Sequence, residues 1–388
     1  MTYPVRVALV HDWLTGMRGG EYVLEAIAEL FPRSDLFTLL YIPGSISPVL
    51  TTLNRHVSWL QKVPKIEKRY RNFLPLMPWT IGKFDLSGFD LVISSSHCVA
   101  KGISKPKGSV HVSYIHAPMR YMWDRYDDYF GPGRASSLVR LAAKSVRKYL
   151  QKWDRGTSTE ERIDALVANS SFISGQIKRI YNRESSIIHP FADTSRFTAP
   201  RKPSKTYLIV SAFAPYKRLD IAIDAFNKLK LPLMVVGSGQ DLSRLKKKAG
   251  PTVDLLGSLS NSAIADLYAK CKALVFPGLE DFGITPVEAM AAGLPVIAYG
   301  EGGVLDTVTD RTGVLFKPQT TEALIEAVLK FEKGEVSVSE EDCRARAAEF
   351  NKAKFQREFV AVLKTAWSKA GKESALLDET LSKSWASY

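Results

Sequence analysis

Short apolar runs alternate with amphipathic segments along the first half of the chain. The runs that predict buried strands are residues 5–10, 36–41, 91–94, 110–115 and 165–168. Between them the spacing of apolar positions is typical of helices, as in residues 21–31 and in the long basic segment 136–154. Strands that alternate with helices form parallel sheets covered on both faces. The first half therefore predicts a doubly wound α/β domain.

A second series of the same kind follows a polar, proline-rich segment at residues 190–205, which we interpret as a linker. Its strands are expected at residues 207–210, 233–236, 253–256, 273–276 and 296–299. The chain has 388 residues, which is enough for two domains. We expect one domain at residues 1–190, joined by helices at 355–375, and the other at 191–354. Residues 373–388 carry little pattern and are expected to be loosely ordered.

The stretch FPGLEDFGITPVEAMAAGLPVIAY at residues 276–299 combines a strand end, an acidic loop and a helix start. Open α/β sheets bind ligands in loops at the carboxyl ends of their strands. Thr285 is suited to cap the helix, Pro286 to its first position and Glu288 to a capping box. A helix that begins here directs free backbone N–H groups at the loop, where Gly283 allows close approach. We therefore predict an anion-binding turn.

Charge points to the same kind of ligand. Lys and Arg number 53 against 40 Asp and Glu, which gives a formal net charge of +13 and favours an anionic partner. A phosphate-bearing substrate, an acidic membrane surface and a nucleic acid all carry the required charge. The sequence contains no helix-turn-helix, zinc-finger or aromatic RNA-binding motif, so we do not expect nucleic acid.

The lengths of the apolar runs and the spacing of the cysteines indicate the cellular compartment. No apolar run is long enough to span a bilayer or to form a secretory signal, so we expect a cytoplasmic protein. Cys98, Cys271 and Cys343 lie far apart in the sequence. This spacing favours reduced thiols over a disulfide framework or a zinc site.

Two adjacent cations, Lys217 and Arg218, follow the predicted strand 207–210 in a strand-to-helix loop. An arginine fork and a lysine point charge together can neutralise a diphosphate. The alternative for this dipeptide is a solvated basic turn. Gly237, which follows the strand 233–236, can admit a nucleotide to the backbone, although by itself it is more typical of a turn.

Glutamates bracket the helix start in the 276–299 stretch. Glu280 and Glu288 are eight positions apart, on opposite sides of the junction between loop and helix, so they can contact different parts of one extended ligand. Carboxylates accept hydrogen bonds from sugar hydroxyls. The alternative is a capping box at Glu288 and a solvated Glu280.

The first domain has its own candidates. Gly19 and Gly20 follow the first strand at a predicted helix start, where they can admit a phosphate or an acceptor sugar. The loop that holds them is neither a Walker loop nor a GxGxxG motif. His116 follows the strand 110–115, and a single histidine at a strand end is more often structural.

Together these residues resemble the donor site of the retaining glycosyltransferases of family 4, whose GT-B fold has two Rossmann-like, doubly wound parallel-sheet domains facing across a cleft. The family's motif of a Glu, seven residues and a second Glu corresponds to residues 280–288. The resemblance implies that Glu280 contacts the hydroxyls of the donor sugar and Glu288 the ribose. It also implies that Lys217 and Arg218 hold the pyrophosphate.

The resemblance covers most of the chain and extends to a subgroup. The implied catalytic residues are Lys217, Arg218, Glu280 and His116, and the implied donor-binding residues are Gly19, Gly20, Gly237, Phe282, Gly283, Ile284, Thr285 and Glu288. The run from His116 through Arg120, Trp123 and Asp124, with 153–155 and 167–170, is similar to the subgroup that builds O-antigen and exopolysaccharide. That subgroup includes mannosyltransferases.

The implied function is therefore transfer of a hexose, with mannose from GDP-mannose the best candidate, to a lipid-linked saccharide with retention at the anomeric carbon. There is no Asp-x-Asp motif in the chain, so we expect neither a metal nor another cofactor beyond the nucleotide-sugar substrate. One alternative is a nucleotide-sugar epimerase of the same fold. The other is a non-catalytic membrane- or glycan-binding protein.

A polyprenyl-diphosphate acceptor would be met at a membrane. In residues 62–79 the cations Lys62, Lys65, Lys68, Arg69 and Arg71 precede the apolar sequence FLPLMPW. This pattern is typical of contact with an anionic membrane surface, here the inner face of the plasma membrane. Arg140, Lys144, Arg147, Lys148 and Lys152 can extend it. The alternative is a basic surface helix followed by a packed loop.

Overall fold

The computed structural model describes residues 4–124, 126 and 137–385, with the backbone alone for residues 137–142 and 384–385. The side chain of Arg140 and the position of Ser136 therefore lie outside the described part. The chain divides into two compact units. The first unit is Met1–His189 with Phe355–Tyr388, and the second unit is Pro190–Lys354.

A parallel sheet of seven strands in the order β3-β2-β1-β4-β5-β6-β7 forms the centre of the first unit. The strands are β1 Val7–His11, β2 Asp35–Thr38, β3 Asn54–Val57, β4 Leu91–Ser96, β5 Val110–Ile115, β6 Ala165–Ala168 and β7 Ser186–Ile187. The edge strands β3 and β7 were not expected from the sequence because they are short and largely exposed, so neither carries an apolar run.

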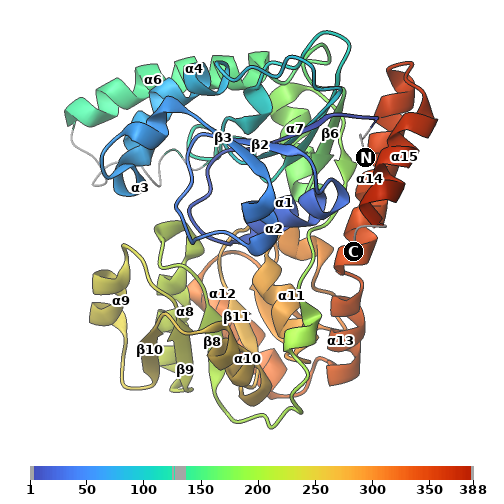
Figure 1. Cartoon of the computed structure of the whole chain (residues 1–388). Coiled ribbons are helices and arrows are strands. Elements are labelled where there is room, and N and C mark those ends of the chain that lie inside the picture. Colours follow the sequence, from blue (N-terminus) through green and yellow to red (C-terminus); the bar gives the residue numbers. More distant parts are fainter. Residues whose placement is uncertain (1–3, 125, 127–136, 386–388) are drawn as a thin grey trace. The chain divides into compact units, whose positions relative to one another are not determined.

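Helices of the first unit come from both ends of the sequence (Figure 1). They are α1 Gly19–Leu30, α2 Pro48–Thr52, α3 Ile66–Arg69, α4 Met77–Ile81, α6 Ser137–Gly156, α7 Ser171–Tyr181, α14 Lys352–Lys369 and α15 Ser374–Trp385, with the 3-10 turns η1 Trp59–Lys62, η2 Tyr70–Leu76 and η3 Ala100–Gly102. The expectation of a loosely ordered end was wrong as far as α15 reaches. Leu377 and Leu381 are buried, and Thr380 accepts a hydrogen bond from Val5 N at 3.2 Å.

Six parallel strands in the order β10-β9-β8-β11-β12-β13 form the sheet of the second unit. They are β8 Tyr207–Val210, β9 Leu233–Val236, β10 Val253–Gly257, β11 Leu274–Phe276, β12 Val296–Tyr299 and β13 Gly313–Phe316. The helices are α8 Leu219–Leu229, α9 Leu242–Lys248, α10 Asn261–Lys270, α11 Ile284–Ala291, α12 Thr321–Glu332 and α13 Glu340–Ala348, with the 3-10 turns η4 Thr194–Arg196, η5 Pro215–Lys217 and η6 Gly303–Asp306.

Helices cover both faces of this second sheet. Leu208 of β8 belongs to the apolar cluster that contains Met290 of α11, whereas its neighbours Tyr207 and Ile209 belong to the cluster that contains Phe226 of α8. Successive residues of a strand point to opposite faces, so each face of the sheet has its own core. The expected doubly wound α/β architecture is confirmed.

Strand order also places the ligand-binding edge. In the first unit the order reverses between β1 and β4, and in the second between β8 and β11. The loops that follow these strands separate at such a point and leave a crevice outside the sheet. Among the helices that the structure describes, none combines the length and the apolar character needed to cross a bilayer.

Candidate functional site

Lys217 and Glu280 meet at the switch point of the second unit. Lys217 ends the η5 turn after β8, and Glu280 lies in the loop after β11. The Lys217 ammonium and the Glu280 carboxylate form an ion pair, and their side chains are only 16% and 13% exposed. The solvated alternative for Glu280 is therefore wrong. Gly278 permits the contact, because a Cβ there would lie 3.0 Å from the Lys217 backbone.

Arg218 stands beside this pair with its backbone in the left-handed region, at φ 51°. Its Nε donates to Asp220 Oδ1 at 3.3 Å, and its Nη1 donates to Gln319 Oε1 at 3.4 Å. Gln319 in turn donates to the carbonyl of Pro277 at 2.8 Å. The guanidinium is thus held from two sides while 37% of the side chain stays exposed, which leaves it able to bind an anion.

The loop that carries Glu280 is held by a pair of glycines. Glu280 forms a bridge with Gly302, and Gly303 N donates to the Glu280 carbonyl at 2.9 Å. A Cβ on Gly302, where φ is 83°, would lie 2.4 Å from that carbonyl, and one on Gly303 would lie 2.3 Å from Phe282 Cα. Neither glycine was predicted as a site residue from the sequence. Their position in the loop after the strand 296–299 could have indicated that role.

Helix α11 begins differently from the expectation. It starts at Ile284, its N-cap is Gly283 with φ 87°, and no side chain caps it. The predicted cap at Thr285 and capping box at Glu288 are wrong, because the left-handed glycine lets the helix start earlier and carries both residues into it. Phe282 is buried against Phe350, with ring centroids 5.7 Å apart, which gives it a core role.

Glu288 lies in the second turn of α11 and does not cap the helix. Its carboxylate is 3.8 Å from Arg196 Nη1. Burial raises the pKa of Glu288, while the Arg196 charge opposes the shift. The buried Tyr268 hydroxyl also faces Glu288, and burial together with that carboxylate raises the pKa of the phenol. Arg196 and Tyr268 carried no sequence motif and were missed.

Gly237 is explained by packing. Its φ is 140°, and a Cβ on it would lie 1.8 Å from the carbonyl oxygen of Ser211. The backbone after β8 therefore fills the space that Gly237 leaves. Close by, Phe213 N donates to Ser238 O at 2.8 Å, which ties the loops after β8 and β9 together.

The first unit has a cluster of histidines at its own switch point. His11 ends β1, His97 follows β4 and His116 follows β5. Ser95 Oγ links two of the rings, at 3.1 Å from His11 Nδ1 and 2.8 Å from His116 Nε2. Burial lowers the pKa of all three histidines, most for His116, and their mutual repulsion adds to the shift for His11 and His116. The cluster is therefore neutral near pH 7.

Gly19 and Gly20 form the first turn of α1 beside these rings. A Cβ on Gly20 would lie 3.5 Å from His116 Nε2, whereas nothing lies within 4 Å of the Cβ position on Gly19. Glu21 Oε2 accepts from Arg18 N at 3.2 Å, so the helix start is capped from within. The structure thus brings His116 together with Gly20 but leaves space beside Gly19.

Asp12, directly after His11, has a structural role. Its carboxylate accepts hydrogen bonds from four successive backbone N–H groups of residues 97–100, at 2.5 to 3.0 Å, and lies 3.1 Å from His97 Nδ1. This arrangement fixes the loop after β4. Among the described residues no three His, Cys, Asp or Glu side chains are placed to hold a metal ion.

Residues that resembled the polysaccharide subgroup prove to be structural partners. Asn169 Nδ2 donates to the His116 carbonyl at 2.9 Å, and Ser170 caps α7. Trp123 Nε1 donates to Asp154 Oδ2 at 2.8 Å. Motif residues that are up to 53 positions apart in sequence therefore hold one another in place.

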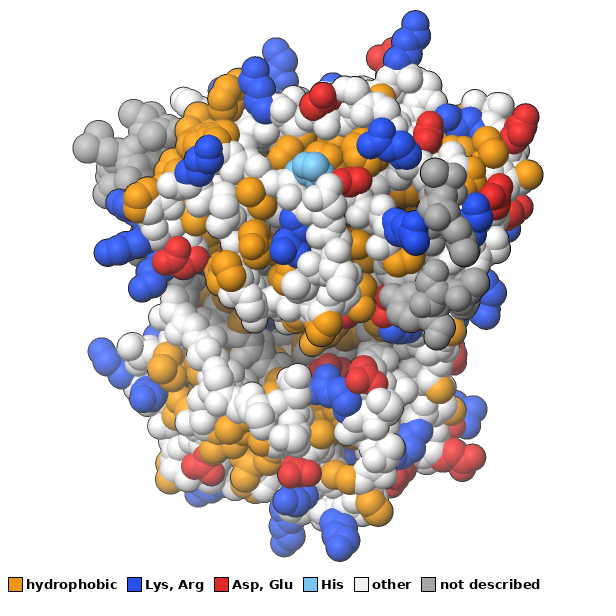
Figure 2. Space-filling view, in the orientation of Figure 1, with side chains coloured by type: hydrophobic (Ala, Val, Ile, Leu, Met, Phe, Trp, Pro, Cys, Tyr) orange, Lys and Arg blue, Asp and Glu red, His pale blue; other side chains and the backbone are white. Residues whose placement is uncertain are grey.

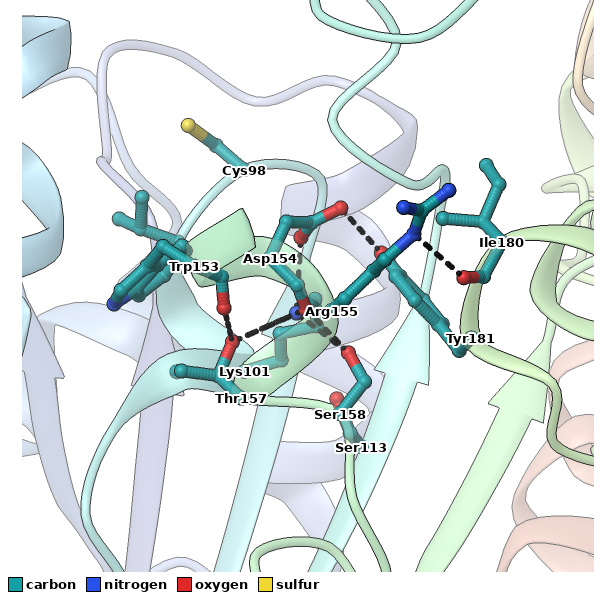
Figure 3. Close-up of polar contacts among 12 residues, drawn as sticks. Cys98, Lys101, Ser113, Trp153, Asp154, Arg155, Thr157, Ser158, Ile180 and Tyr181 are labelled. Atoms are coloured by element: carbon teal, nitrogen blue, oxygen red, sulfur yellow. Dashed lines mark hydrogen bonds and ion pairs between the residues drawn. The ribbon is translucent and has the colours of Figure 1, made fainter. Parts of the chain in front are cut away.

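Asp154 is the centre of a buried polar network (Figure 3). Its carboxylate pairs with the Lys101 ammonium at 2.9 Å and accepts from Tyr181 Oη at 3.0 Å. Lys101 also donates to the oxygens of Thr157 and Ser158, at 3.1 and 2.8 Å. The network joins the η3 turn after β4 to the end of α6 and to α7.

Comparison with known proteins gives this geometry a context. Residues 191–350 match the model of the family described as Glycosyl transferases group 1. The chain is 36% identical over 212 residues to the GDP-mannose-dependent alpha-mannosyltransferase of Mycolicibacterium smegmatis, covering 54% of this chain and 49% of that protein. It is 26% identical over 220 residues to the O-antigen chain mannosyltransferase C of Escherichia coli, covering 51% of this chain and 57% of that protein. The solved structure of sucrose-phosphate synthase from Thermosynechococcus elongatus matches 94% of this chain and 100% of its own with a TM-score of 0.68 at 17% identity.

Residues 191–350 thus resemble the group 1 glycosyl transferases, and the structural match confirms the fold that the resemblance implied. The family model covers nearly all of the second unit, which contains Lys217, Arg218, Glu280 and Glu288. Two parallel-sheet, Rossmann-like units are the GT-B architecture. The chain spans about half the length of the curated relatives it matches, at 49% and 57%.

Proposed function

Because residues 191–350 form a domain of the Glycosyl transferases group 1 family, we propose that the protein is a retaining glycosyltransferase that uses a nucleotide-sugar donor. The observation that carries the proposal is the pairing of Lys217 with Glu280 beside Arg218 at the switch point of this domain. It brings cations for a diphosphate next to a carboxylate for sugar hydroxyls. Glycosyl transfer from a sugar nucleotide requires both.

Each residue has a part in the proposed reaction. Lys217 and Arg218 stabilise the departing diphosphate, and the start of α11 at Gly283 adds backbone donors. Glu280 accepts hydrogen bonds from the sugar, and Glu288 accepts from the ribose. We further propose that His116, Gly19 and Gly20 of the first unit take part in substrate binding.

The transfer itself needs no further group. The bond from the anomeric carbon to the diphosphate oxygen breaks, and the acceptor hydroxyl forms its bond to the same face of that carbon. The proton of the hydroxyl passes to the departing diphosphate oxygen. Exclusion of water protects the oxocarbenium-like centre from hydrolysis. No Asp-x-Asp motif occurs in the sequence, and we propose that the reaction is independent of metal.

For the donor we propose GDP-mannose. Support comes from the names of two relatives, a GDP-mannose-dependent alpha-mannosyltransferase and an O-antigen chain mannosyltransferase. As acceptor we propose a polyprenyl-diphosphate-linked glycan in the synthesis of a surface polysaccharide. Such an acceptor keeps its lipid tail in the bilayer, so the protein would work at the cytoplasmic face of the plasma membrane.

Lys217→Ala provides the test. Loss of a preorganised group that stabilises developing charge typically lowers kcat by about 100- to 1,000-fold. Donor turnover is measured with GDP-, UDP- and ADP-sugars, after a thermal-shift screen has ranked them. Lys228→Ala is the matched control, since that lysine lies on the exposed face of α8 and pairs with Glu322 of α12. Unchanged kcat in Lys217→Ala would contradict the assignment of this site.

A further inference from the structure

Three large apolar side chains project into solvent from neighbouring turns of the first unit. Trp59, Leu76 and Trp79 are 40%, 48% and 56% exposed. The rings of Trp59 and Trp79 lie together, with their centroids 6.4 Å apart. Burial of these side chains is not needed for the core below, which Leu60, Met77 and Ile81 already fill. We call the three residues the apolar tip.

The apolar tip differs from the surface that the sequence suggested. Within the FLPLMPW segment, Met77 and Pro78 are buried, while Phe73 and Leu74 pack against the core cluster. Leu76 and Trp79 face outward. Trp59 joins them from the η1 turn, and its Nε1 donates to Thr80 Oγ1 at 3.1 Å, which fixes the ring in this position.

Cations surround the apolar tip. Residues 57–84 contain six cations against one acid, and all of these charged side chains are exposed: Lys62, Lys65, Lys68, Arg69, Arg71, Lys83 and the single acid Glu67. No ion pair to these six cations occurs among the residues that the structure describes. The Lys83 ammonium lies 5.3 Å from the centre of the Trp79 ring. Figure 2 shows hydrophobic and basic side chains together at the upper left, over the region that Figure 1 labels α3 and α4.

The combination of exposed apolar side chains and surrounding cations is more typical of a surface that binds an anionic bilayer than of one that binds a protein or a nucleic acid. Tryptophan is enriched at the headgroup level of membranes, and each cation near an anionic leaflet contributes about fivefold in affinity. Three side chains are too few for the roughly 1,200 to 2,000 Å² of a stable protein interface. Nucleic-acid bases need open ring faces, but Lys83 lies over the ring of Trp79 and the two tryptophan rings are inclined at 62°.

We propose that the apolar tip inserts into the headgroup region of an anionic phospholipid bilayer while the six surrounding cations bind its headgroups. The inference rests on the proposed function for its purpose, because a lipid-linked acceptor is met at that surface. Its physical basis is separate, since it depends on residues 57–84 and on none of the donor-site residues.

Sedimentation of the full chain with vesicles tests the proposal. We expect binding to vesicles of phosphatidylglycerol and phosphatidylcholine, at least tenfold weaker binding to pure phosphatidylcholine, and loss of binding as salt is raised. Trp79→Ala is expected to weaken binding at least tenfold. Leu305→Ala, which removes a 53% exposed side chain from the second unit, is the matched control and is expected to bind as the parent does.

A second variant changes only exposed charges, so the test does not depend on whether Trp79→Ala folds correctly. Lys68→Glu with Arg71→Glu is expected to weaken binding to anionic vesicles by at least tenfold, with the melting temperature unchanged. Binding that is equal on neutral vesicles, or unaffected in both variants, would overturn the proposal. The proposal would also be overturned if the parent protein formed dimers and Trp79→Ala made it monomeric, since the apolar tip would then bind a second copy of the chain.

Donor hydrolysis without acceptor or vesicles separates the two proposals. If the membrane surface is wrong, the tip variants hydrolyse the donor at the parental rate and the parent fails to sediment. If the proposed function is wrong, the parent sediments with anionic vesicles but no sugar nucleotide is bound or hydrolysed. Each result refutes one proposal and leaves the other standing.

Discussion

Replacement of Lys101 by methionine is expected to destabilise the first unit by about 3 kcal/mol. Lys101 is 2% exposed and Asp154 is fully buried, so the charge left behind has no access to water. Loss of one partner from a buried pair typically costs about 3 to 5 kcal/mol. The lower end applies, because Trp123 and Tyr181 still donate to the Asp154 carboxylate in the variant.

A double-mutant cycle isolates the pair from the packing around it. Asp154→Asn leaves the Lys101 ammonium buried without a carboxylate, and burial already lowers the pKa of that lysine in the parent. The variant should therefore become more stable as pH rises toward 10.5, since the folded state then holds a neutral amine more readily than the unfolded chain does. The double variant should recover at least about 1.5 kcal/mol relative to the sum of the single changes.

Urea unfolding followed by circular dichroism measures these costs, with separate transitions fitted if the two units unfold separately. Lys105→Met is the control, because the Lys105–Asp164 pair is 17% and 25% exposed and its loss should cost about 1 kcal/mol or less. The reasoning fails if Lys101→Met costs no more than Lys105→Met, or if the cycle shows no coupling.

Two further outcomes follow from the structure. Gly237→Ala places a Cβ 1.8 Å from a backbone oxygen and should cost about 3 kcal/mol or more by urea unfolding, whereas Gly257→Ala, with φ 74° and open space, should cost only about 1 kcal/mol; equal costs would show that the clash is relieved. Burial lowers the pKa of His111 from 6.5 to about 4, so as the pH falls the unfolded chain takes up this proton before the folded chain does. The contribution of His111 to stability should therefore fall by roughly 3 kcal/mol as pH drops from 6.5 to 4. His111→Asn should flatten that fall, and an unchanged pH profile would contradict the assignment.

Local pattern was sufficient for the central strands. Residues 110–115, 165–168, 207–210, 233–236 and 296–299 were predicted at the bounds that the structure has. Strands buried on both faces are rich in apolar residues, so the signal lies within the strand itself. The edge strands β3 and β7 carry no such signal, because they exist only through pairing with a neighbour.

Helix ends followed tertiary context more than local chemistry. The sequence from Thr285 to Glu288 has the composition of a capping box, yet α11 begins one residue before it, at Ile284, with Gly283 as its N-cap. The left-handed conformation of that glycine arises where its loop packs against Phe276. Helix α15 likewise forms because Leu377 and Leu381 are buried, although its own pattern is weak.

The sequence by itself determined the α/β class, the net positive charge and the motif that carries Glu280 and Glu288. All of these depend on residue type and on spacing along a short stretch of chain. Tertiary structure decided which side chains meet: Lys217 with Glu280 across 63 positions, and Ser95 with His11 and His116. The physical reason is that strand order is set when the sheet assembles. Only that order makes neighbours of loops that are far apart in sequence.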